Sequence, residues 1–270
     1  MTLKIAVHGA AGRMGRSVIE VIMSDPAATL VAAVEQPESQ ALGQDAGILA
    51  GSMTRIDVTV TSGLNEALEA ADVVIDFSTP AATAALIKAC LKKPVPVVVG
   101  TTGLTAATRK DLKKLAKRAP VALAPNFSVG VNALVYLASR AVQLLGPAFD
   151  IEIVEMHHRN KVDAPSGTAL RLTEAVAKAR GLKPGTAMVK GRSGKVGARR
   201  AEEIGVMALR GGDVVGEHTL VLAGPGERLE LTHRAHNRLI FARGAVRAAH
   251  WVVEQKPSCY DMADVLDLPR

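Results

Sequence analysis

Short, continuous apolar runs alternate with amphipathic segments from the N-terminus to about residue 127. Such runs are typical of strands buried on both faces of a parallel sheet, and the periodicity between them is typical of helices. The predicted strands are Leu3–His8, Leu30–Val34, Asp72–Phe77, Val95–Val99 and Val121–Ala124. Helices are predicted from the first glycine turn to about Met23, over Thr83–Leu91 and over Ala106–Lys117. This order predicts a Rossmann-like α/β domain with a doubly wound parallel sheet.

The pattern changes near Asn126, and the chain later becomes rich in strands. The predicted elements are helices Val131–Leu145 and Thr168–Arg180 and strands Asp150–Glu155, Ile204–Leu209, Val214–Leu222 and Arg228–Arg234. Gly-Gly-Asp and Gly-Pro-Gly turns join the later strands, and such turns are typical of antiparallel sheets. We therefore expect residues 128–239 to form an α+β domain with a largely antiparallel or mixed sheet. A last helix, Ala242–Val253, resembles those of the first domain, so residues 240–270 are expected to complete residues 1–127.

Composition favours a small anionic ligand. Of the 270 residues, 48% are hydrophobic but only 3% are aromatic, so the core is expected to be aliphatic. The net charge is +7, with basic residues spread thinly apart from a cluster at 190–200. Because that cluster lacks aromatic side chains that could stack on bases, we expect anionic metabolites as ligands and no nucleic-acid partner.

The cysteines and the apolar runs indicate a cellular location. Cys90 and Cys259 are the only cysteines and lie in no CxxC motif, which favours reduced thiols over a disulfide or metal framework. The N-terminus enters a strand directly and leaves no room for a signal peptide. No apolar run is judged to approach the ~18 residues of a membrane span. We expect a cytoplasmic protein without a membrane partner.

A glycine-rich turn, Gly9-Ala-Ala-Gly-Arg-Met-Gly15, falls between the first strand and the first helix. In a dinucleotide-binding turn, Gly9 would make the tight turn, Gly12 would let the backbone approach the pyrophosphate, and Gly15 would allow close helix packing. The spacing is G-x-x-G-x-x-G instead of the strict G-x-G-x-x-G. An ordinary strand-to-helix connection therefore stays open as an alternative.

The end of the second strand bears on the choice of cofactor. Glu35 lies twenty residues beyond Gly15, where a carboxylate would bind the adenosine ribose, or it is simply a solvated charge. Gln36 stands where a cation would help to hold a 2′-phosphate, which favours NADH. Arg13 could still face such a phosphate, so both NADH and NADPH remain open.

Two further turns follow predicted strands at their carboxyl ends, where ligands collect in open parallel sheets. They are Gly100-Thr-Thr-Gly103 and Ala124-Pro-Asn-Phe127. Each could line a nicotinamide pocket with backbone groups, or could be an ordinary connection.

Candidate catalytic and binding side chains are most concentrated in the segment 155–168, at the end of a predicted strand. Imidazoles such as His157 and His158 can donate a proton near neutral pH, and Lys161 can bind a carboxylate. Ser166 is a plausible helix cap, and amides at the start of that helix suit a carboxylate too. We predict a site that binds and protonates a small dicarboxylate, with plain helix capping as the alternative for the serine.

Metal binding is not expected at this segment. Adjacent histidines on a strand chelate poorly, and no third ligand follows at a convincing spacing. Arg159 and Asp163 are interpreted as a local ion pair, and Arg210–His218 as a hairpin turn with structural charges.

Five segments, in order along almost the whole chain, resemble the bacterial 4-hydroxy-tetrahydrodipicolinate reductases, also called dihydrodipicolinate reductases. The most specific is Glu155-Met-His-His-Arg-Asn-Lys-Val-Asp-Ala-Pro-Ser-Gly-Thr-Ala169. The others are Val7-His-Gly-Ala-Ala-Gly-Arg-Met-Gly15, Gly100-Thr-Thr-Gly103, Ala124-Pro-Asn-Phe-Ser-Val-Gly130 and Gly212-Asp-Val-Val-Gly-Glu-His218.

The resemblance implies an NAD(P)H-dependent step of lysine and diaminopimelate biosynthesis. It converts (2S,4S)-4-hydroxy-2,3,4,5-tetrahydrodipicolinate to 2,3,4,5-tetrahydrodipicolinate with loss of water. It also implies a homotetramer assembled through the strand-rich domain, which binds the substrate.

The resemblance assigns roles residue by residue. His157 matches the proton donor and Lys161 a second donor, while His158, Gly167 and Thr168 match substrate-binding positions that we extend to Ser166. The implied cofactor contacts are Gly9, Ala10, Ala11, Gly12, Arg13, Met14, Glu35, Gly100, Thr101, Thr102, Ala124, Pro125, Asn126 and Phe127. One departure is Gln36, because NADPH-accepting relatives carry a basic residue there.

Two other classes fit the sequence less well. Another amino-acid dehydrogenase, such as an aspartate or homoserine dehydrogenase, would share the architecture but is disfavoured by the Pro-Ser-Gly-Thr turn after the paired histidines. A redox-sensing regulator would lack a proton donor and carry a DNA-binding segment, and neither condition is met.

Overall fold

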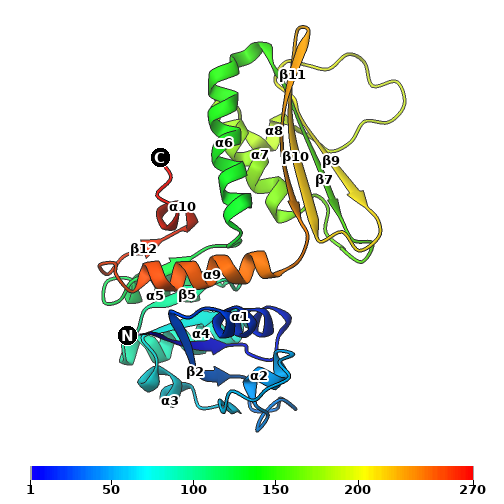
Figure 1. Cartoon of the computed structure of the whole chain (residues 1–270). Helices are drawn as coiled ribbons and strands as arrows, with labels where there is room; N and C mark the ends of the chain where they lie inside the picture. The colour runs from blue at the N-terminus through cyan, green and yellow to red at the C-terminus, as the bar shows by residue number, and fades with distance from the viewer. Residues whose placement is uncertain (1, 270) are drawn as a thin grey trace. The chain divides into compact units, whose positions relative to one another are not determined.

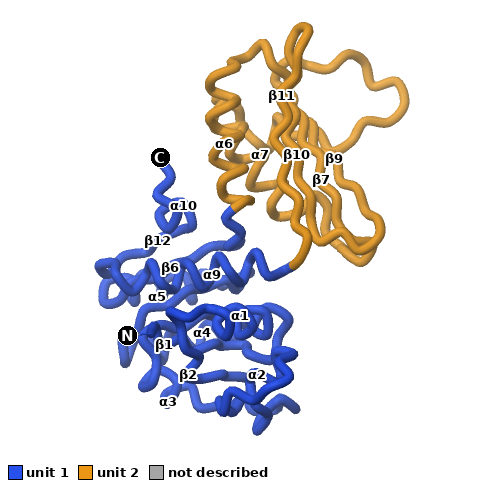
Figure 2. Tube along the Cα trace, viewed as in Figure 1, with its two compact units in different colours: residues 1–129, 238–270 blue, residues 130–237 orange. Residues whose placement is uncertain are grey.

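The computed structural model describes residues 2–269. The chain forms two compact units, one made of residues 1–129 and 238–270 and the other of residues 130–237 (Figure 2). The sequence placed these boundaries at 127/128 and 239/240. The chain thus leaves the first unit, builds the second, and returns.

A seven-stranded parallel sheet, of which β2, β5 and β12 are labelled in Figure 1, forms the centre of unit 1. Its strand order is β12-β6-β5-β4-β1-β2-β3. Its strands are β1 (Leu3–His8), β2 (Ala28–Val34), β3 (Val60–Thr61), β4 (Val73–Asp76), β5 (Val97–Val99), β6 (Val121–Leu123) and β12 (Cys259–Tyr260). The order reverses between β1 and β4, whose carboxyl-terminal residues His8 and Asp76 are in register. Ligands bind at such switch points in open parallel sheets.

Helices cover both faces of this sheet. They are α1 (Arg13–Ser24), α2 (Ala46–Leu49), α3 (Leu64–Ala70), α4 (Pro80–Lys92), α5 (Ala106–Leu115), α9 (Leu239–Val252) and α10 (Met262–Val265). Ile5 and Val7 of β1 belong to the apolar cluster that contains α1 and α9. Ala6, on the opposite face, belongs to the cluster that contains α4 and α5. The predicted doubly wound Rossmann-like fold is confirmed.

Helix α9 shows how the returning chain joins unit 1. A Cβ atom at Gly244 would lie 1.7 Å from the carbonyl oxygen of Phe127, so only glycine allows this approach of helix to backbone. Ala242, Ala245 and Ala249 of the same helix are fully buried. Small residues therefore let α9 pack directly on the sheet.

A five-stranded mixed sheet forms unit 2, in the order β11-β10-β7-β9-β8. Its strands are β7 (Asp150–His157), β8 (Met188–Val189), β9 (Ile204–Arg210), β10 (Gly216–Gly224) and β11 (Glu227–Ala235). The helices are α6 (Val129–Leu145), η1 (Gly146–Ala148), α7 (Gly167–Arg180) and α8 (Pro184–Ala187). One sheet face packs on α6 and α7 through Ile151, Ile153 and Leu220.

The interpretation of residues 210–218 as a hairpin turn is wrong. Strands β9 and β10 are not neighbours, because β7 lies between them, parallel to β9 and antiparallel to β10. Residues 211–215 therefore cross the carboxyl end of β7, where the Gly211 amide donates to the His157 carbonyl (3.0 Å). Only the Gly-Pro-Gly connection, between β10 and β11, joins adjacent antiparallel strands.

One helical segment corrects the expectation that no apolar run approaches a membrane span. Val129–Ala148 is 20 residues long and apolar enough to cross a bilayer by length and composition alone. Leu134, Ala138 and Val142 of this segment pack into the core of unit 2. A core helix of a globular unit passes the same test.

Candidate active site

The glycine turn of unit 1 builds an open helix N-terminus. Gly9 has a φ of +82°, which favours glycine, and Gly12 precedes α1 without a side-chain cap. A Cβ atom at Gly15 would lie 2.1 Å from the Gly9 carbonyl oxygen, so this glycine allows α1 to pack against the turn. First-turn amides, which begin at Arg13 and Met14, lack intrahelical acceptors and suit an anion.

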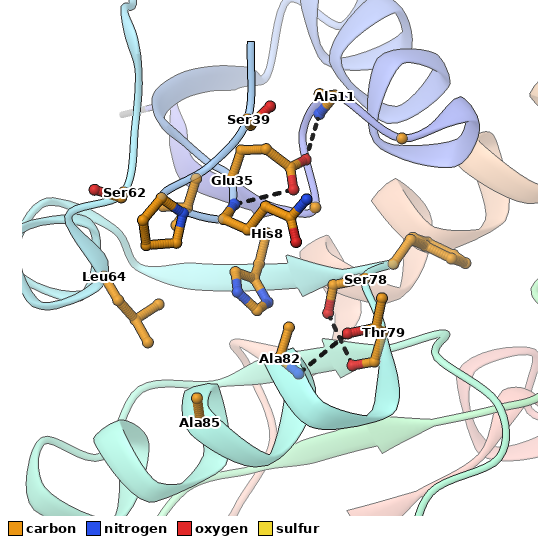
Figure 3. Close-up of a pocket in the computed structure, with 16 residues that line it drawn as sticks. His8, Ala11, Glu35, Ser39, Ser62, Leu64, Ser78, Thr79, Ala82 and Ala85 are labelled. Atoms are coloured by element: carbon orange, nitrogen blue, oxygen red, sulfur yellow. Dashed lines mark hydrogen bonds between the residues drawn. The ribbon is translucent and has the colours of Figure 1, made fainter. Parts of the chain in front are cut away.

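A pocket of about 490 Å³ opens beside this turn (Figure 3). Four predicted cofactor residues line it: Gly9, Ala11, Gly12 and Glu35. Gln36, which the sequence connected with the choice of cofactor, lines it too. Residues that the sequence did not single out complete the lining: His8, Val34, Pro37, Ser39, Ser62, Leu64, Phe77, Ser78, Thr79, Ala82 and Ala85. The pocket therefore lies at the switch point, over the carboxyl ends of β1, β2 and β4.

Glu35 binds the glycine turn inside this pocket. Its Oε2 accepts from the Ala11 amide (2.9 Å) and its Oε1 from the Gln36 amide (3.0 Å), as the dashed lines in Figure 3 show. The carboxylate is thus held at the pocket wall by backbone donors. Acceptor oxygens in this position suit ribose hydroxyls and repel an added phosphate.

The other predicted cofactor residues lie outside this pocket lining. Ala10 and Phe127 are 0% and 1% exposed, so their side chains belong to the core. Thr101 donates its hydroxyl to buried Asp76. The remaining residues are Arg13 and Met14 in α1, and Gly100, Thr102, Ala124, Pro125 and Asn126 in the turns after β5 and β6.

A buried carboxylate at the switch point, Asp76, was not predicted from the sequence. Asp76 is fully buried and pairs with His8 Nδ1 (2.8 Å). It also accepts from the hydroxyls of Ser78 (2.6 Å), Thr83 (2.6 Å) and Thr101 (3.0 Å). This carboxylate ties together β1, β4, α4 and the turn after β5. Its signal was a charge ending an otherwise apolar strand.

In unit 2, His157 is the last residue of β7 and its side chain is 12% exposed. Its Nδ1 lies 2.6 Å from Oε2 of Glu155, which is 0% exposed. The two side chains share the face of β7 that carries buried Ile151 and Ile153, because alternate residues point to one face. A glutamate in phase with core isoleucines was the sequence signal for this pair.

Arg210 holds Glu155 in two parallel hydrogen bonds, Nη1 to Oε2 (2.8 Å) and Nη2 to Oε1 (2.9 Å). The Ser166 amide donates a further bond to Oε1 (3.1 Å). Burial alone would raise the pKa of the Glu155 carboxyl, but the bonds from Arg210, His157 and Ser166 outweigh it and lower that pKa. Glu155 is therefore an ionised, fully buried carboxylate.

His218 lies on β10, the strand next to β7, and its side chain contacts the site. Its ring lies edge-on to that of His157, with centroids 5.2 Å apart, and its Nε2 lies 3.0 Å from Ser166 Oγ. Burial first, and then the charge of His157, lower the pKa of His218 to about 4. Ser166 Oγ also accepts from the Ala169 amide (3.1 Å), so the predicted cap of α7 is present.

Lys161 lies in the loop after β7 and pairs with Asp163 through bonds of 2.7 and 2.9 Å. The partner of Asp163 is therefore Lys161, which corrects the interpretation of Arg159 and Asp163 as an ion pair. Lys161 is 19% exposed at its side chain. His158 lies just beyond β7, and Gly167 and Thr168 are the first two residues of α7.

Unit 2 thus brings His157 together with Glu155, Arg210, His218 and Ser166. The result is an imidazole with one nitrogen tied to a carboxylate, beside an ammonium group and a helix N-terminus. Within residues 2–269, no group of three or more His, Cys, Asp or Glu side chains is arranged to hold a metal ion.

Two solved structures with a similar fold are dehydrogenases. One is a myo-inositol dehydrogenase from Lactobacillus casei in complex with NAD(H) and myo-inositol, with a TM-score of 0.55 and 15% identity over 98% of this chain and 91% of that one. Another is an amine dehydrogenase from Mycobacterium smegmatis, with a TM-score of 0.61 and 16% identity over 100% and 97%. The chain therefore shares its fold with these two dehydrogenases.

Closer relatives narrow this class. Family models described as dihydrodipicolinate reductase, N-terminus and C-terminus, match residues 3–127 and 130–266. A 4-hydroxy-tetrahydrodipicolinate reductase from Alkalilimnicola ehrlichii is 51% identical over 99% of this chain and 100% of its own length. A dipicolinate-bound dihydrodipicolinate reductase from a Paenisporosarcina species has a TM-score of 0.78 and 25% identity over 98% and 99%. The chain belongs to the dihydrodipicolinate reductase family and is a nicotinamide-dependent oxidoreductase.

The Asp76 network makes a prediction about stability. Asp76→Ala should lower the free energy of unfolding by at least about 3 kcal/mol, because each buried donor left without an acceptor costs about 1–3 kcal/mol. Chemical denaturation measures this loss. Asp72→Ala is the control, since within residues 2–269 this exposed carboxylate accepts a hydrogen bond only from the Lys4 amide, and its loss should cost about 1 kcal/mol or less. Equal losses in the two variants would refute a special role for Asp76.

Proposed function

We propose that the chain reduces (2S,4S)-4-hydroxy-2,3,4,5-tetrahydrodipicolinate to 2,3,4,5-tetrahydrodipicolinate with loss of water, in lysine and diaminopimelate biosynthesis. The main support is His157, an imidazole whose Nδ1 is hydrogen-bonded to the buried carboxylate of Glu155. The chain is also 51% identical to a protein named 4-hydroxy-tetrahydrodipicolinate reductase. The dipicolinate bound to a relative supports a small dicarboxylate as the ligand.

Binding of such a dicarboxylate is assigned to the segment around α7. Lys161 supplies an ammonium group, and the amide of Gly167 stands at the helix N-terminus, where a carboxylate is favoured. We assign His158, Ser166 and Thr168 to the same role. Ser166 acts through its cap and its bond to His218, which together hold the start of α7 in place.

The chemistry needs one hydride and one proton. A reduced nicotinamide, when bound, supplies the hydride to C4 of the conjugated cyclic imine. Attack there leaves electron density on the imine system, and a nearby acid must quench it. We assign His157 as that acid and Lys161 as a second donor.

We place the adenosine end of the cofactor in the pocket of unit 1. The amides at the start of α1 would face the phosphates, and Glu35 would accept from the ribose hydroxyls. The other assigned contacts are Ala10, Arg13, Met14, the turn 100–102 and the turn 124–127. Because a carboxylate lines the ribose position and Gln36 is uncharged, we propose that NADH is accepted at least as well as NADPH.

A homotetramer assembled through unit 2 is part of the proposal, with the cytoplasm as its location. The sheet face opposite α6 and α7 carries the apolar side chains Val154, Met207, Leu209 and Val221, none of them fully buried, and Leu209 is 50% exposed. An exposed apolar sheet face is typical of a subunit interface.

The first test concerns the reaction itself. Purified protein supplied with the product of the preceding aldolase-type synthase should oxidise the reduced nicotinamide rapidly. His157→Gln should lower kcat by about 10²–10⁴-fold, the usual range for losing a general acid. Lys161→Ala should lower kcat and raise KM. Near-wild-type kinetics in both variants would show that the assigned site is wrong.

The second test concerns cofactor choice. Steady-state kinetics should give a KM for NADH no higher than that for NADPH, and Gln36→Arg should lower the KM for NADPH by about tenfold through a new charge-assisted hydrogen bond. Gln40→Arg is the matched control, because Gln40 is exposed and lies outside the pocket lining. A much lower KM for NADPH in the unaltered protein would overturn the proposed preference.

The third test concerns assembly. Val221→Glu should dissociate the tetramer in sedimentation measurements, because a charge cannot be buried unpaired at an interface. Leu229→Glu is the control, since Leu229 opposes Leu222 on the other face of the sheet and should leave the assembly intact. A species smaller than a tetramer in the unaltered protein would contradict the proposal.

A further inference from the structure

We propose that Glu155, held by Arg210, is the positioning residue that decides which ring nitrogen of His157 carries the transferred proton. This inference rests on the proposed function of His157 as proton donor. It assigns a role to Glu155 on β7 and Arg210 on β9, which hold the proton donor His157 without themselves donating the proton.

The first step is the identity of the bonded hydrogen. An ionised carboxylate only accepts hydrogen bonds. Glu155 is ionised and lies 2.6 Å from His157 Nδ1, so this nitrogen must carry a hydrogen. In the neutral ring the other nitrogen, Nε2, is then bare. His157 must therefore take up a proton at Nε2 before it can give one away.

The second step is the rigidity of the carboxylate. Both Glu155 oxygens are occupied, one by Arg210 and His157 and the other by Arg210 and the Ser166 amide. Because the arginine bonds are bidentate, the carboxylate plane is fixed, and the plane fixes the direction of the bond to the imidazole. The ring therefore has one orientation, with Nε2 on the side away from Glu155.

The third step is the space around Nε2. This atom lies over the backbone at Gly216, where β10 begins, and a Cβ atom there would approach it to 3.0 Å. Glycine leaves this edge of the ring uncrowded. The strand that follows the crossing segment 211–215 thus makes room for the nitrogen that exchanges the proton.

The fourth step is the balance of charge on His157. The charged or titratable groups that face it are Glu155, Lys161, Arg210 and His218. Burial first lowers the pKa of His157; Glu155 raises it, while Lys161 and Arg210 lower it, and the net result is below the usual value. Buried His218, with its pKa of about 4, stays neutral at physiological pH.

These charges suggest when the proton is taken up. Near neutral pH the free protein keeps His157 neutral, with Nε2 bare. A dicarboxylate that binds beside Lys161 brings negative charge, which favours the imidazolium. Nε2 takes up a proton from the surrounding solution. The substrate, after it has received the hydride from a bound reduced nicotinamide, accepts this proton from Nε2, which is then bare again.

Opposite shifts in pH dependence test this inference. Since protonated His157 is the active form, kcat/KM should fall as pH rises through its pKa. We call this decrease in kcat/KM the alkaline limb of the pH profile. Glu155→Gln removes the negative charge, which lowers the pKa of His157, so the alkaline limb should move about one pH unit lower. Arg210→Gln removes a positive charge and should move the alkaline limb higher. A limb that stays in place in Glu155→Gln, or that moves the same way in both variants, would overturn the inference.

Controls separate this inference from its premise and from a loss of fold. Glu152→Gln is the matched control, because Glu152 lies on the same strand and pairs with Arg192 and Arg199 but faces away from His157. Its limb should not move, and a shift like that of Glu155→Gln would overturn the inference. If His157→Gln keeps its turnover, the proposed function fails. If that variant loses turnover while Glu155→Gln keeps the limb, only the positioning role fails.

Discussion

The buried charge of Glu155 is the interaction on which the candidate active site depends. A carboxylate without partners in this environment would give up its charge or unfold the strand end that carries it. Arg210, His157 and the Ser166 amide prevent this, and in doing so they join β9, β7 and the start of α7. The groups that keep the charge buried are those that place the imidazole beside the helix N-terminus.

Unit 1 also contains a buried carboxylate that is held by hydrogen-bond donors. Asp76 ends β4 as Glu155 lies near the end of β7, and each is fully buried, bonded to a histidine, and surrounded by donors from other elements. In both units the chain uses one buried carboxylate to gather loops at the carboxyl end of a strand. In unit 1, that end is where open parallel sheets bind ligands.

Much of the fold and part of the candidate site could be predicted from the sequence. Continuous apolar runs gave the parallel strands, because burial on both faces leaves no polar alternation. The two-residue strands β3, β8 and β12 were missed, since segments so short carry no periodicity. The crossing segment 211–215 was taken for a hairpin because its glycines are typical of turns, whereas the partner of β9 is chosen by long-range packing. Arg210 and His218 were undervalued for the same reason, as only the sheet register brings them to Glu155.

The position of the hydrogen on the neutral His157 imidazole shows whether Glu155 positions the proton donor or has only a structural role. Nitrogen-15 NMR of the His157 imidazole in the free protein, recorded above its pKa, distinguishes a protonated from a bare ring nitrogen. The account predicts hydrogen on Nδ1 and a bare Nε2. A neutral ring with its hydrogen on Nε2 would contradict it, because Glu155 would then not be holding the proton donor.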